Sequence, residues 1–326
     1  MRAVHCKEFG GPETLVIEEA ETQKPGPSQM RIAVRAAGVN FADLLMISGH
    51  YQHKPPFPFA PGLELAGEVI ECGKDARRAK VGDRVMAGVT HGAYAEEAVA
   101  EDSRVFPIPD SMSFEIAAGF MVAYGTSHVG LGHRVGLKKG ETLLVHGASG
   151  GVGLTAVEIG TVMGATVIAA ASSPEKLKVA ASRGAEHLID YSHEDVRERV
   201  KEITGGRGAD VIYDPVGGDA FDASLRCINW EGRILVIGFA SGKIPKIPAN
   251  ILLVKNVSAV GFYWGAYMQK DPQVIYDSFA ELFEWFESGR LRPHISDSFA
   301  MDDAASALKL VQSRHSTGKV VLTMGN

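Results

Sequence analysis

The segment Glu141–Ala156, ETLLVHGASGGVGLTA, constrains the fold of this chain more than any other stretch. It consists of a short apolar run, a turn that contains four glycines, and a sequence suited to begin a helix. At the first turn of a helix, the backbone N–H groups lack intrahelical partners and the helix dipole favours negative charge, so such a turn can hold a phosphate. Because a strand precedes the turn and a helix follows it, we interpret the segment as a dinucleotide-binding turn rather than an ordinary tight loop.

Individual residues of this turn can be matched to roles. Gly150 lets the backbone approach a pyrophosphate, and Gly153 lets the helix pack closely on the strand. The match to the pattern G-x-G-x-x-G is imperfect, because Ala148 stands where the first glycine is expected and Gly147 lies one place earlier. We therefore expect a Rossmann-type site whose turn is open to a shift of one residue.

Length and composition limit the class of protein. A length of 326 residues is about twice that of a typical single domain, so two domains are expected. A net charge of -6 provides no basic surface for nucleic acid. The N-terminal residues lack the apolar core of a signal peptide, and no run is long enough to span a bilayer. The spacing of Cys6, Cys72 and Cys227 fits neither disulfides nor zinc, which favours reduced thiols in a cytoplasmic protein.

The sequence pattern changes near residue 111. Before it, short apolar or alternating runs separated by glycine and proline predict a largely antiparallel β unit, interrupted by one helix after Asn40. After a predicted helix at Phe114–Val135, strand candidates alternate with helical stretches, which predicts a parallel sheet with crossover helices. These strand candidates are Thr142–Val145, Ala165–Ala171, His187–Ile189, Val211–Tyr213, Ile234–Ile237 and Val257–Phe262. We interpret the elements beyond Tyr267, including a last strand at Lys319–Thr323, as a return to the N-terminal unit.

The end of the second predicted strand bears on which dinucleotide binds. An NAD site has a carboxylate about 20 residues after the glycines, which accepts hydrogen bonds from the ribose 2′-hydroxyl. Here Ser172 and Ser173 occupy that position, and Pro174 begins the next helix. Lys176 lies in the first turn of that helix, within reach of a 2′-phosphate that a carboxylate would repel. The pattern favours NADP(H) over NAD(H); the alternative is a solvated helix start with an ordinary lysine.

Several segments together resemble the medium-chain dehydrogenase/reductase superfamily along the full chain, and within it the zinc-free quinone oxidoreductase branch. The glycine turn alone is moderately specific, and its combination with Asn-Phe-Ala-Asp at 40–43 is highly specific. The segments that carry the resemblance are Ala36–Asp43, Ser48–Tyr51, Val81–Val85, Ala148–Gly153, Asp214–Gly218, Asn250–Leu253, Gly261–Gly265 and Thr317–Val321.

The resemblance implies an α/β fold with two domains. A GroES-like, mainly β catalytic domain is formed by 1–122 and 265–326, and a Rossmann doubly wound parallel sheet by 123–264, with NADPH in the cleft between them. The cofactor-binding residues that the resemblance implies are Asn40, Thr126, Ser149, Gly150, Gly151, Val152, Ser172, Ser173, Lys176, Tyr191, Gly238, Phe239 and Arg314. Among these, Tyr191 can equally be a turn residue, and Arg314 a solvated helix end.

The resemblance also bears on metal dependence. Zinc-dependent members of the superfamily carry a cysteine where Asn40 stands and a histidine just before Glu64, where this chain has Leu63. Catalytic zinc needs three N, S or O ligands, and the eleven histidines are scattered without suitably spaced partners. We therefore expect no metal site.

Without a Lewis acid, alcohol oxidation is difficult, whereas an electron-poor quinone can accept hydride when it is held at reacting distance. The candidate catalytic residues are Asn40, whose amide can donate to a ligand oxygen, and Tyr51, whose hydroxyl can polarise a carbonyl or deliver a proton. Asn40 can alternatively be the N-cap of the helix that follows it, and Tyr51 an ordinary loop aromatic.

The favoured function is therefore reduction of a quinone by direct, zinc-independent hydride transfer from NADPH. Two alternatives stay open: reduction of α,β-unsaturated carbonyls such as enones or enoyl-CoA, and a cofactor-binding protein with little turnover. The apolar segment Asn250–Phe262 could place an edge strand at a two-fold axis, which together with the resemblance suggests a homodimer.

Overall fold

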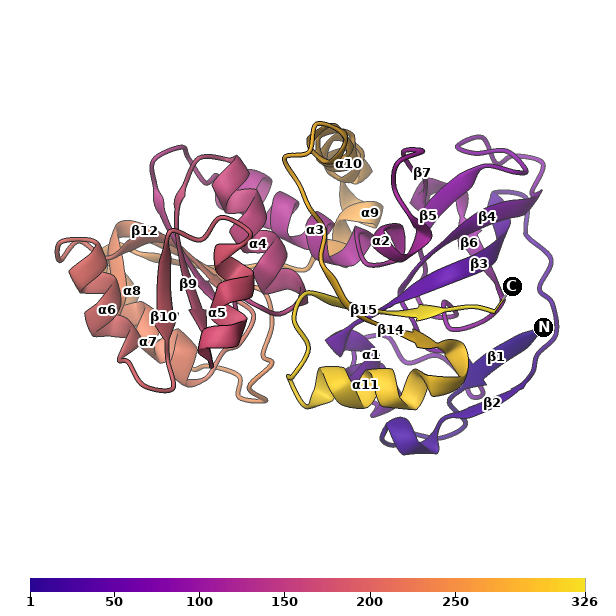
Figure 1. Cartoon of the computed structure of the whole chain (residues 1–326), viewed down its shortest axis with the longest axis horizontal. Helices are drawn as coiled ribbons and strands as arrows, with labels where there is room; N and C mark the ends of the chain where they lie inside the picture. The colour runs from indigo at the N-terminus through magenta and orange to yellow at the C-terminus, as the bar shows by residue number, and fades with distance from the viewer. Residues whose placement is uncertain (326) are drawn as a thin grey trace. The chain divides into compact units, whose positions relative to one another are not determined.

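Both ends of the chain build one folded unit, and the chain between them builds a second. In this computed structural model, which describes residues 1–325, unit 1 consists of Met1–Val122 and the chain from Pro293 onward (Figure 1). Unit 2 consists of Ala123–Arg292. Within the described part of the chain, no helix has both the length and the apolar character needed to cross a bilayer.

Unit 1 is centred on a mainly antiparallel sheet in the order β14-β15-β3-β4-β5-β7, with β6 also paired to β3. The strands of this unit are β1 (Arg2–His5), β2 (Val16–Glu19), β3 (Gln29–Val39), β4 (Glu64–Cys72), β5 (Arg84–Gly88), β6 (Glu97–Glu101), β7 (Val105–Pro107), β14 (Ile295–Ala300) and β15 (Lys319–Thr323). Its helices are α1 (Phe41–Ile47), α2 (Phe114–Ala118) and α11 (Ala304–Gln312). The last strand, β15, pairs antiparallel with β3 and so completes a sheet that the N-terminal part begins (Figure 1).

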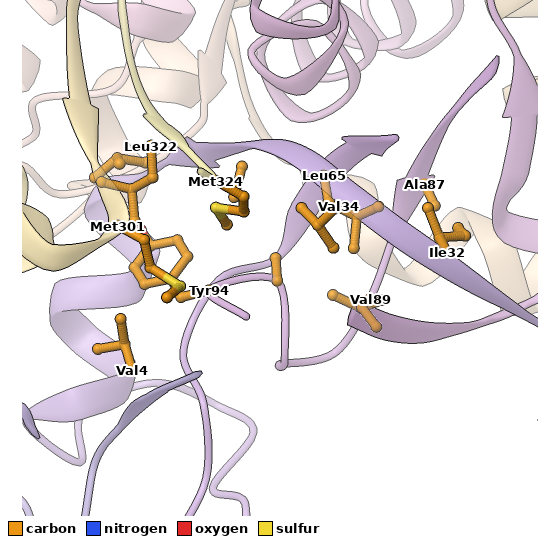
Figure 2. Close-up of a cluster of buried hydrophobic side chains, with 14 of the residues drawn as sticks. Val4, Ile32, Val34, Leu65, Ala87, Val89, Tyr94, Met301, Leu322 and Met324 are labelled. Carbon is orange, nitrogen blue, oxygen red and sulfur yellow. The ribbon is translucent and has the colours of Figure 1, made fainter. Parts of the chain in front are cut away.

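Every second residue in the first part of β3 is buried, and these side chains contribute to the core beneath the sheet. Met30, Ile32 and Val34 are buried and the residues between them are partly exposed, as expected for a strand with a period of two. Figure 2 shows Val34 together with side chains from both ends of the chain, including Val4 and Leu322, in the resulting cluster. Full burial of a large apolar side chain contributes roughly 1.5–3 kcal/mol relative to exposure. Both chain ends are therefore needed to complete the core.

Unit 2 contains a parallel sheet in the order β10-β9-β8-β11-β12-β13. Counted within the unit, this is the order of a Rossmann fold. The strands are β8 (Thr142–His146), β9 (Thr166–Ala171), β10 (His187–Asp190), β11 (Ala209–Asp214), β12 (Ile228–Val236) and β13 (Ser258–Gly261). The helices are α3 (Met121–His128), α4 (Gly151–Val162), α5 (Pro174–Ala181), α6 (Val196–Ile203), α7 (Asp219–Cys227), α8 (Ala249–Lys255), α9 (Tyr267–Lys270) and α10 (Pro272–Glu287). The predicted fold class, a doubly wound parallel sheet with a mainly β unit, is confirmed.

The chain returns to unit 1 at Pro293, later than the residue 265 expected from the sequence. The structural reason is that α10 packs within unit 2. The Oγ of Ser278 lies 2.9 Å from Nδ1 of His128, and the ring of Trp285 meets the His128 ring edge-on with centroids 5.0 Å apart. An amphipathic pattern identifies the apolar face of such a helix but does not identify the element which that face covers.

Two segments differ from the sequence expectation. The helix expected over Phe114–Val135 is interrupted, because Gly119 ends α2, α3 follows, and a π-helical turn covers 129–134. The segment Asn250–Phe262, in which an edge strand was expected, begins as the helix α8. Asn256, in the left-handed conformation with φ 52, ends that helix, and β13 then forms the edge of the sheet.

Candidate functional site

The glycine turn of unit 2 has the geometry of a phosphate cradle. Gly147 follows the end of β8 with φ +56, a conformation that favours glycine. Its carbonyl oxygen accepts a 3.0 Å hydrogen bond from the N–H of Gly150, which precedes α4. A Cβ on Gly153 would overlap the Gly147 carbonyl oxygen, so only glycine permits this close approach of helix to strand. The turn therefore begins at Gly147, and Ala148 is buried beneath it.

The first turn of α4 provides the donors. The N–H groups of Gly151 and Val152 lie where an α-helix has no intrahelical acceptors, next to the buried Ser149. Ser127 on α3 donates from Oγ to the carbonyl oxygen of Val152 over 3.0 Å, and Thr126, the residue before it, is buried.

Ser127 is a residue that the sequence did not reveal as important. Its Oγ also lies 2.8 Å from Oγ1 of Thr155 and 3.0 Å from the hydroxyl of Tyr213. Thr155 in turn donates to the carbonyl oxygen of Ala123 over 3.1 Å. A buried hydrogen-bond network of this kind holds its elements in one arrangement, here α3, α4 and β11. Its members are single hydroxyl residues far apart in the sequence, so no local pattern links them.

The residues expected at a 2′-phosphate gather at the carboxyl ends of β9 and β10. Ser173 caps α5 by accepting a 3.4 Å hydrogen bond from the N–H of Lys176. The Nζ of Lys176 donates to Oγ of Ser172 over 3.1 Å. Tyr191, which is 49% exposed, lies at the same place because its N–H donates to the carbonyl oxygen of Ala171 over 3.1 Å. One lysine, two serines and one tyrosine thus form a partly exposed polar group suited to a phosphate.

Gly238 and Phe239 follow β12 at the same carboxyl edge of the sheet. The N–H of Gly238 lies 3.4 Å from the carbonyl oxygen of Asp214 at the end of β11. The carboxylate of Asp214 accepts hydrogen bonds from the N–H groups of Val216 and Gly217 at 2.8 and 2.9 Å, which fixes the neighbouring turn. Ligands of open parallel sheets bind at this edge, and the unit 2 residues named from the sequence lie along it or beside the glycine turn.

In unit 1, Asn40 occupies the N-cap position of α1 and forms a capping box with Asp43. Oδ2 of Asp43 accepts a 2.8 Å hydrogen bond from the N–H of Asn40. The Asn40 carboxamide also accepts from Nζ of Lys319 at 2.7 Å and donates from Nδ2 to Oε1 of Glu64 at 2.9 Å.

Lys319 and Glu64 form a buried ion pair with an Nζ–Oε1 distance of 2.8 Å, and their side chains are 7% and 0% exposed. Lys319 also donates to the carbonyl oxygen of Val39 at 3.0 Å, and Oε2 of Glu64 accepts from the N–H of Val122 at 2.8 Å. Sequence reasoning gave neither residue a role. The sequence did contain one indication of this pair. Lys319 begins an apolar strand, and a charged side chain that is buried almost always has a partner of opposite charge.

Asp43 is the other buried acid of this cluster. Its Oδ2 accepts a 2.9 Å hydrogen bond from the hydroxyl of Tyr94, while Oδ1 has no hydrogen-bond partner among residues 1–325. Burial raises the pKa of Asp43 to about 7, against the lowering effect of its hydrogen bonds and of the Lys319 charge. Burial, followed by the charge of Asp43, raises the pKa of Tyr94 well above its usual value.

The two other predicted residues of unit 1 belong to different segments from this cluster. Tyr51 lies in the loop after α1, with its N–H bonded to the carbonyl oxygen of Leu45 at 3.0 Å and its ring packed against the apolar core. Arg314 follows α11 with φ +60. The catalytic roles of Asn40 and Tyr51 and the phosphate role of Arg314 stay predictions.

Comparison with known proteins decides the family. Two protein-family models match the chain, the alcohol dehydrogenase GroES-like domain at residues 26–110 and zinc-binding dehydrogenase at residues 151–287. A quinone oxidoreductase-like protein 2 homolog from Nematostella vectensis is 47% identical over 325 residues, covering 98% of this chain and 88% of that protein. The chain belongs to the quinone oxidoreductase branch of the medium-chain dehydrogenase/reductase superfamily.

Solved structures of this quinone oxidoreductase branch agree with that placement. The quinone oxidoreductase of Pseudomonas syringae pv. Tomato DC3000 has a TM-score of 0.93 and 36% identity, with 99% of each chain covered. Escherichia coli quinone oxidoreductase, solved in complex with NADPH, has a TM-score of 0.93 and 30% identity over 99% of this chain and all of that one. The predicted family is confirmed, and the chain is an oxidoreductase.

One of the two matching family models is described as zinc-binding dehydrogenase. The residues that this chain has at the zinc-ligand positions do not fit a catalytic zinc ion. At the superfamily's ligand positions, Leu63 has no donor atom, and the carboxamide of Asn40 is already bonded on both sides. The ammonium of Lys319 lies within 2.8 Å of Oδ1 of Asn40 and Oε1 of Glu64, so these oxygens already contact a cation. Elsewhere in residues 1–325, no group of three or more His, Cys, Asp or Glu side chains is arranged to hold a metal.

Proposed function

We propose that this protein reduces quinones by direct hydride transfer from NADPH and does so without zinc. The observation that carries the proposal is a phosphate-binding glycine turn combined with Asn40, which stands where zinc-dependent relatives carry a cysteine and whose oxygen accepts from the buried Lys319 ammonium. The names of full-length relatives support a quinone as the acceptor.

NADPH is the cofactor. Its pyrophosphate fits the glycine turn, where a Cβ on Gly153 would fill the space between helix and strand. Its 2′-phosphate fits the group formed by Ser172, Ser173, Lys176 and Tyr191, in which no carboxylate ends β9. Bound NADPH supplies a hydride from C4 of its nicotinamide ring.

The chain's own contribution is to position the reactants and to place polar groups. Asn40 offers an amide N–H to a carbonyl oxygen, and Tyr51 offers a hydroxyl that can polarise a carbonyl or pass on a proton. Neither residue acts as a Lewis acid. The favoured acceptor is therefore one that is already electron-poor, such as a quinone.

The function can be tested with a panel of quinones, enones, acyl-CoA compounds and alcohols, each monitored by NADPH oxidation or formation. We expect quinones to be reduced fastest, with no change in rate after treatment with a chelator. Faster turnover of enones or enoyl-CoA would favour the alkene-reductase alternative, and binding of NADPH without turnover would favour a cofactor-binding protein. Stoichiometric zinc together with activity lost on chelation would overturn the zinc-independent mechanism.

Removing the Lys176 side chain should weaken NADPH binding selectively. We expect Lys176→Ala to raise the Kd for NADPH roughly 10–100-fold, because a charge-assisted hydrogen bond to the 2′-phosphate is lost, while the Kd for NADH stays the same. Lys178→Ala, on the exposed face of the same helix, is the matched control and should change neither constant. Titration of wild type and both variants with each cofactor, six pairs in all, measures the effect. An equal rise of the Kd for NADPH and for NADH in Lys176→Ala would disprove this assignment.

We further propose that the protein forms a homodimer through β13. This strand is the edge of the unit 2 sheet, pairing only with β12 among the described residues. Exposed apolar side chains lie close to it in sequence, with Leu253 76% and Val254 72% exposed. An open edge strand beside apolar surface favours pairing with a second copy. Sedimentation should give a dimer at micromolar concentration, and a monomer alone would contradict the proposal.

A further inference from the structure

The hydrogen bonds around Asn40 fix which of its two amide atoms points in which direction. An ammonium can only donate, so the atom 2.7 Å from Nζ of Lys319 is the carboxamide oxygen. A carboxylate can only accept, so the atom 2.9 Å from Oε1 of Glu64 is the carboxamide nitrogen. Reversing the amide would set donor against donor on one side and acceptor against acceptor on the other.

We propose that Lys319 and Glu64 are positioning residues that lock the Asn40 carboxamide in a single orientation, so that Asn40 presents an N–H donor and not an acceptor to a bound ligand. The ligand atom that fits this arrangement is a carbonyl oxygen, from the carboxamide of the nicotinamide or from the quinone. That last step rests on the proposed function, whereas the locking of the amide does not.

The surroundings leave little freedom to the two charged side chains. Each of the three donors of Lys319 has an oxygen within 3.0 Å, from Val39, Asn40 and Glu64. Both carboxylate oxygens of Glu64 are bonded as well, since Oε2 accepts from Val122. A Cβ on Gly38 would overlap Oε1 of Glu64, so this glycine makes the space that the carboxylate fills.

One contact in this set is weaker than the rest. The second N–H of Asn40 is directed at the carbonyl oxygen of Gly38, but the distance from Nδ2 is 3.4 Å, against 2.9 Å to Oε1 of Glu64. Such a long hydrogen bond is easily exchanged for a better one. Asn40 is half-buried, whereas Lys319 and Glu64 are buried. The amide, and not the charged pair, is therefore the part that can contact a ligand.

The direct test changes both charged residues together, because removing one leaves the other charge buried and unpaired. In the variant Glu64→Gln/Lys319→Met, the N–H of Val122 requires the oxygen of the carboxamide introduced at position 64, so the nitrogen of that carboxamide faces Asn40. This arrangement favours the reversed Asn40 amide. A variant that carries neither buried charge should remain folded by circular dichroism.

The orientation can be read by NMR without any turnover. The chain has five asparagines, at 40, 229, 250, 256 and 326, so labelling asparagine side chains with ¹⁵N gives a small set of NH₂ signals. The Asn40 pair is identified as the one that disappears in Asn40→Asp. We expect one of its protons to be shifted downfield by the Glu64 carboxylate in the wild type, and to move to the ordinary range in the double variant. An unchanged pair would overturn the proposal.

The functional part is measured on the same proteins. We expect the double variant to lose roughly tenfold or more in NADPH affinity or in kcat/KM for quinone, the loss that follows when one ligand hydrogen bond is removed. A rise in the Kd for NADPH assigns the ligand oxygen to the nicotinamide, and a loss confined to quinone turnover assigns it to the acceptor. Wild-type binding and kinetics alongside a changed amide signal would overturn the proposal while leaving the proposed quinone reduction intact.

Should this double variant fail to fold, two other variants provide the second measurement. Arginine, like lysine, can only donate, so Lys319→Arg should keep both the downfield amide proton and the ligand affinity. Glu64→Gln/Lys319→Gln carries neither buried charge and can present either oxygen or nitrogen at both positions, so it should lose both. Equal behaviour of the two variants, in the NMR signal and in NADPH binding, would overturn the proposal.

Discussion

Replacing Gly153 with alanine is expected to raise the Kd for NADPH roughly 10–100-fold, as expected for the loss of a charge-assisted hydrogen bond to the pyrophosphate, and to destabilise unit 2. The added methyl group would overlap the carbonyl oxygen of Gly147 and lie 2.8 Å from its carbonyl carbon. These are backbone atoms and not the end of a flexible side chain, so α4 would have to move away from β8. Fluorescence titration with NADPH and thermal unfolding would measure the two effects.

Gly150→Ala provides a matched comparison within the same turn. Its Cβ would meet the Gly147 carbonyl oxygen at 3.4 Å, an ordinary contact, and the backbone at Gly150 has φ -79, which alanine adopts readily. We therefore expect normal thermal stability but weaker NADPH binding, because the methyl group stands where the phosphate approaches the backbone. Gly132→Ala, whose Cβ has only the end of Met163 within reach, at 3.9 Å, should change neither property. Normal NADPH binding by Gly153→Ala would contradict our assignment of this turn.

The free energy of unfolding is expected to fall as the pH rises from about 5 to about 7, by about 2 kcal/mol from Asp43 alone. Burial raises the pKa of this carboxyl to about 7 in the folded protein, compared with 3.8 when it is exposed. Between these two values the folded state binds more protons than the unfolded state, so stability is highest at the acidic end and is lost as Asp43 ionises. Chemical denaturation at several pH values would measure the slope.

Asp43→Asn isolates this contribution. The asparagine keeps an oxygen that can accept the hydrogen bonds from Tyr94 and from the N–H of Asn40, but it does not titrate. Other buried groups also affect the wild-type curve. Glu158, with its pKa raised by burial, acts in the same direction as Asp43, and His146, with its pKa lowered by burial, acts in the opposite direction. The pH dependence of the free energy of unfolding should therefore differ between the two proteins by the Asp43 contribution. An identical pH dependence would contradict the raised pKa of Asp43.

The parts of the fold that depend on local pattern could be predicted from the sequence. The glycine turn, the alternation of strands and helices in unit 2, and the group at Ser172–Lys176 all follow from residues close together in the chain. The position of the turn was uncertain by one residue, because the pattern alone does not show that Gly147 adopts a positive φ.

The parts that depend on distant partners could not be predicted. Lys319 and Glu64 are 255 positions apart, so their ion pair arises only when β15 joins the sheet of the N-terminal strands. The same pairing brings the Lys319 ammonium to the Asn40 carboxamide, a contact that the local sequence around Asn40 does not indicate. The return of the chain at Pro293 depends on which unit α10 covers, and the pattern of α10 itself does not specify this.

The position of β15 after unit 2 in the sequence has a consequence for biosynthesis. Unit 2 is continuous in sequence and can fold as soon as it leaves the ribosome. Unit 1 cannot, because β15, the strand that pairs with β3, and the lysine that neutralises Glu64 are translated only after the whole of unit 2. Until β15 is made, the edge of β3 is unpaired and Glu64 lacks its lysine partner. A nascent chain released at that stage would have a folded Rossmann unit attached to an incompletely folded unit 1.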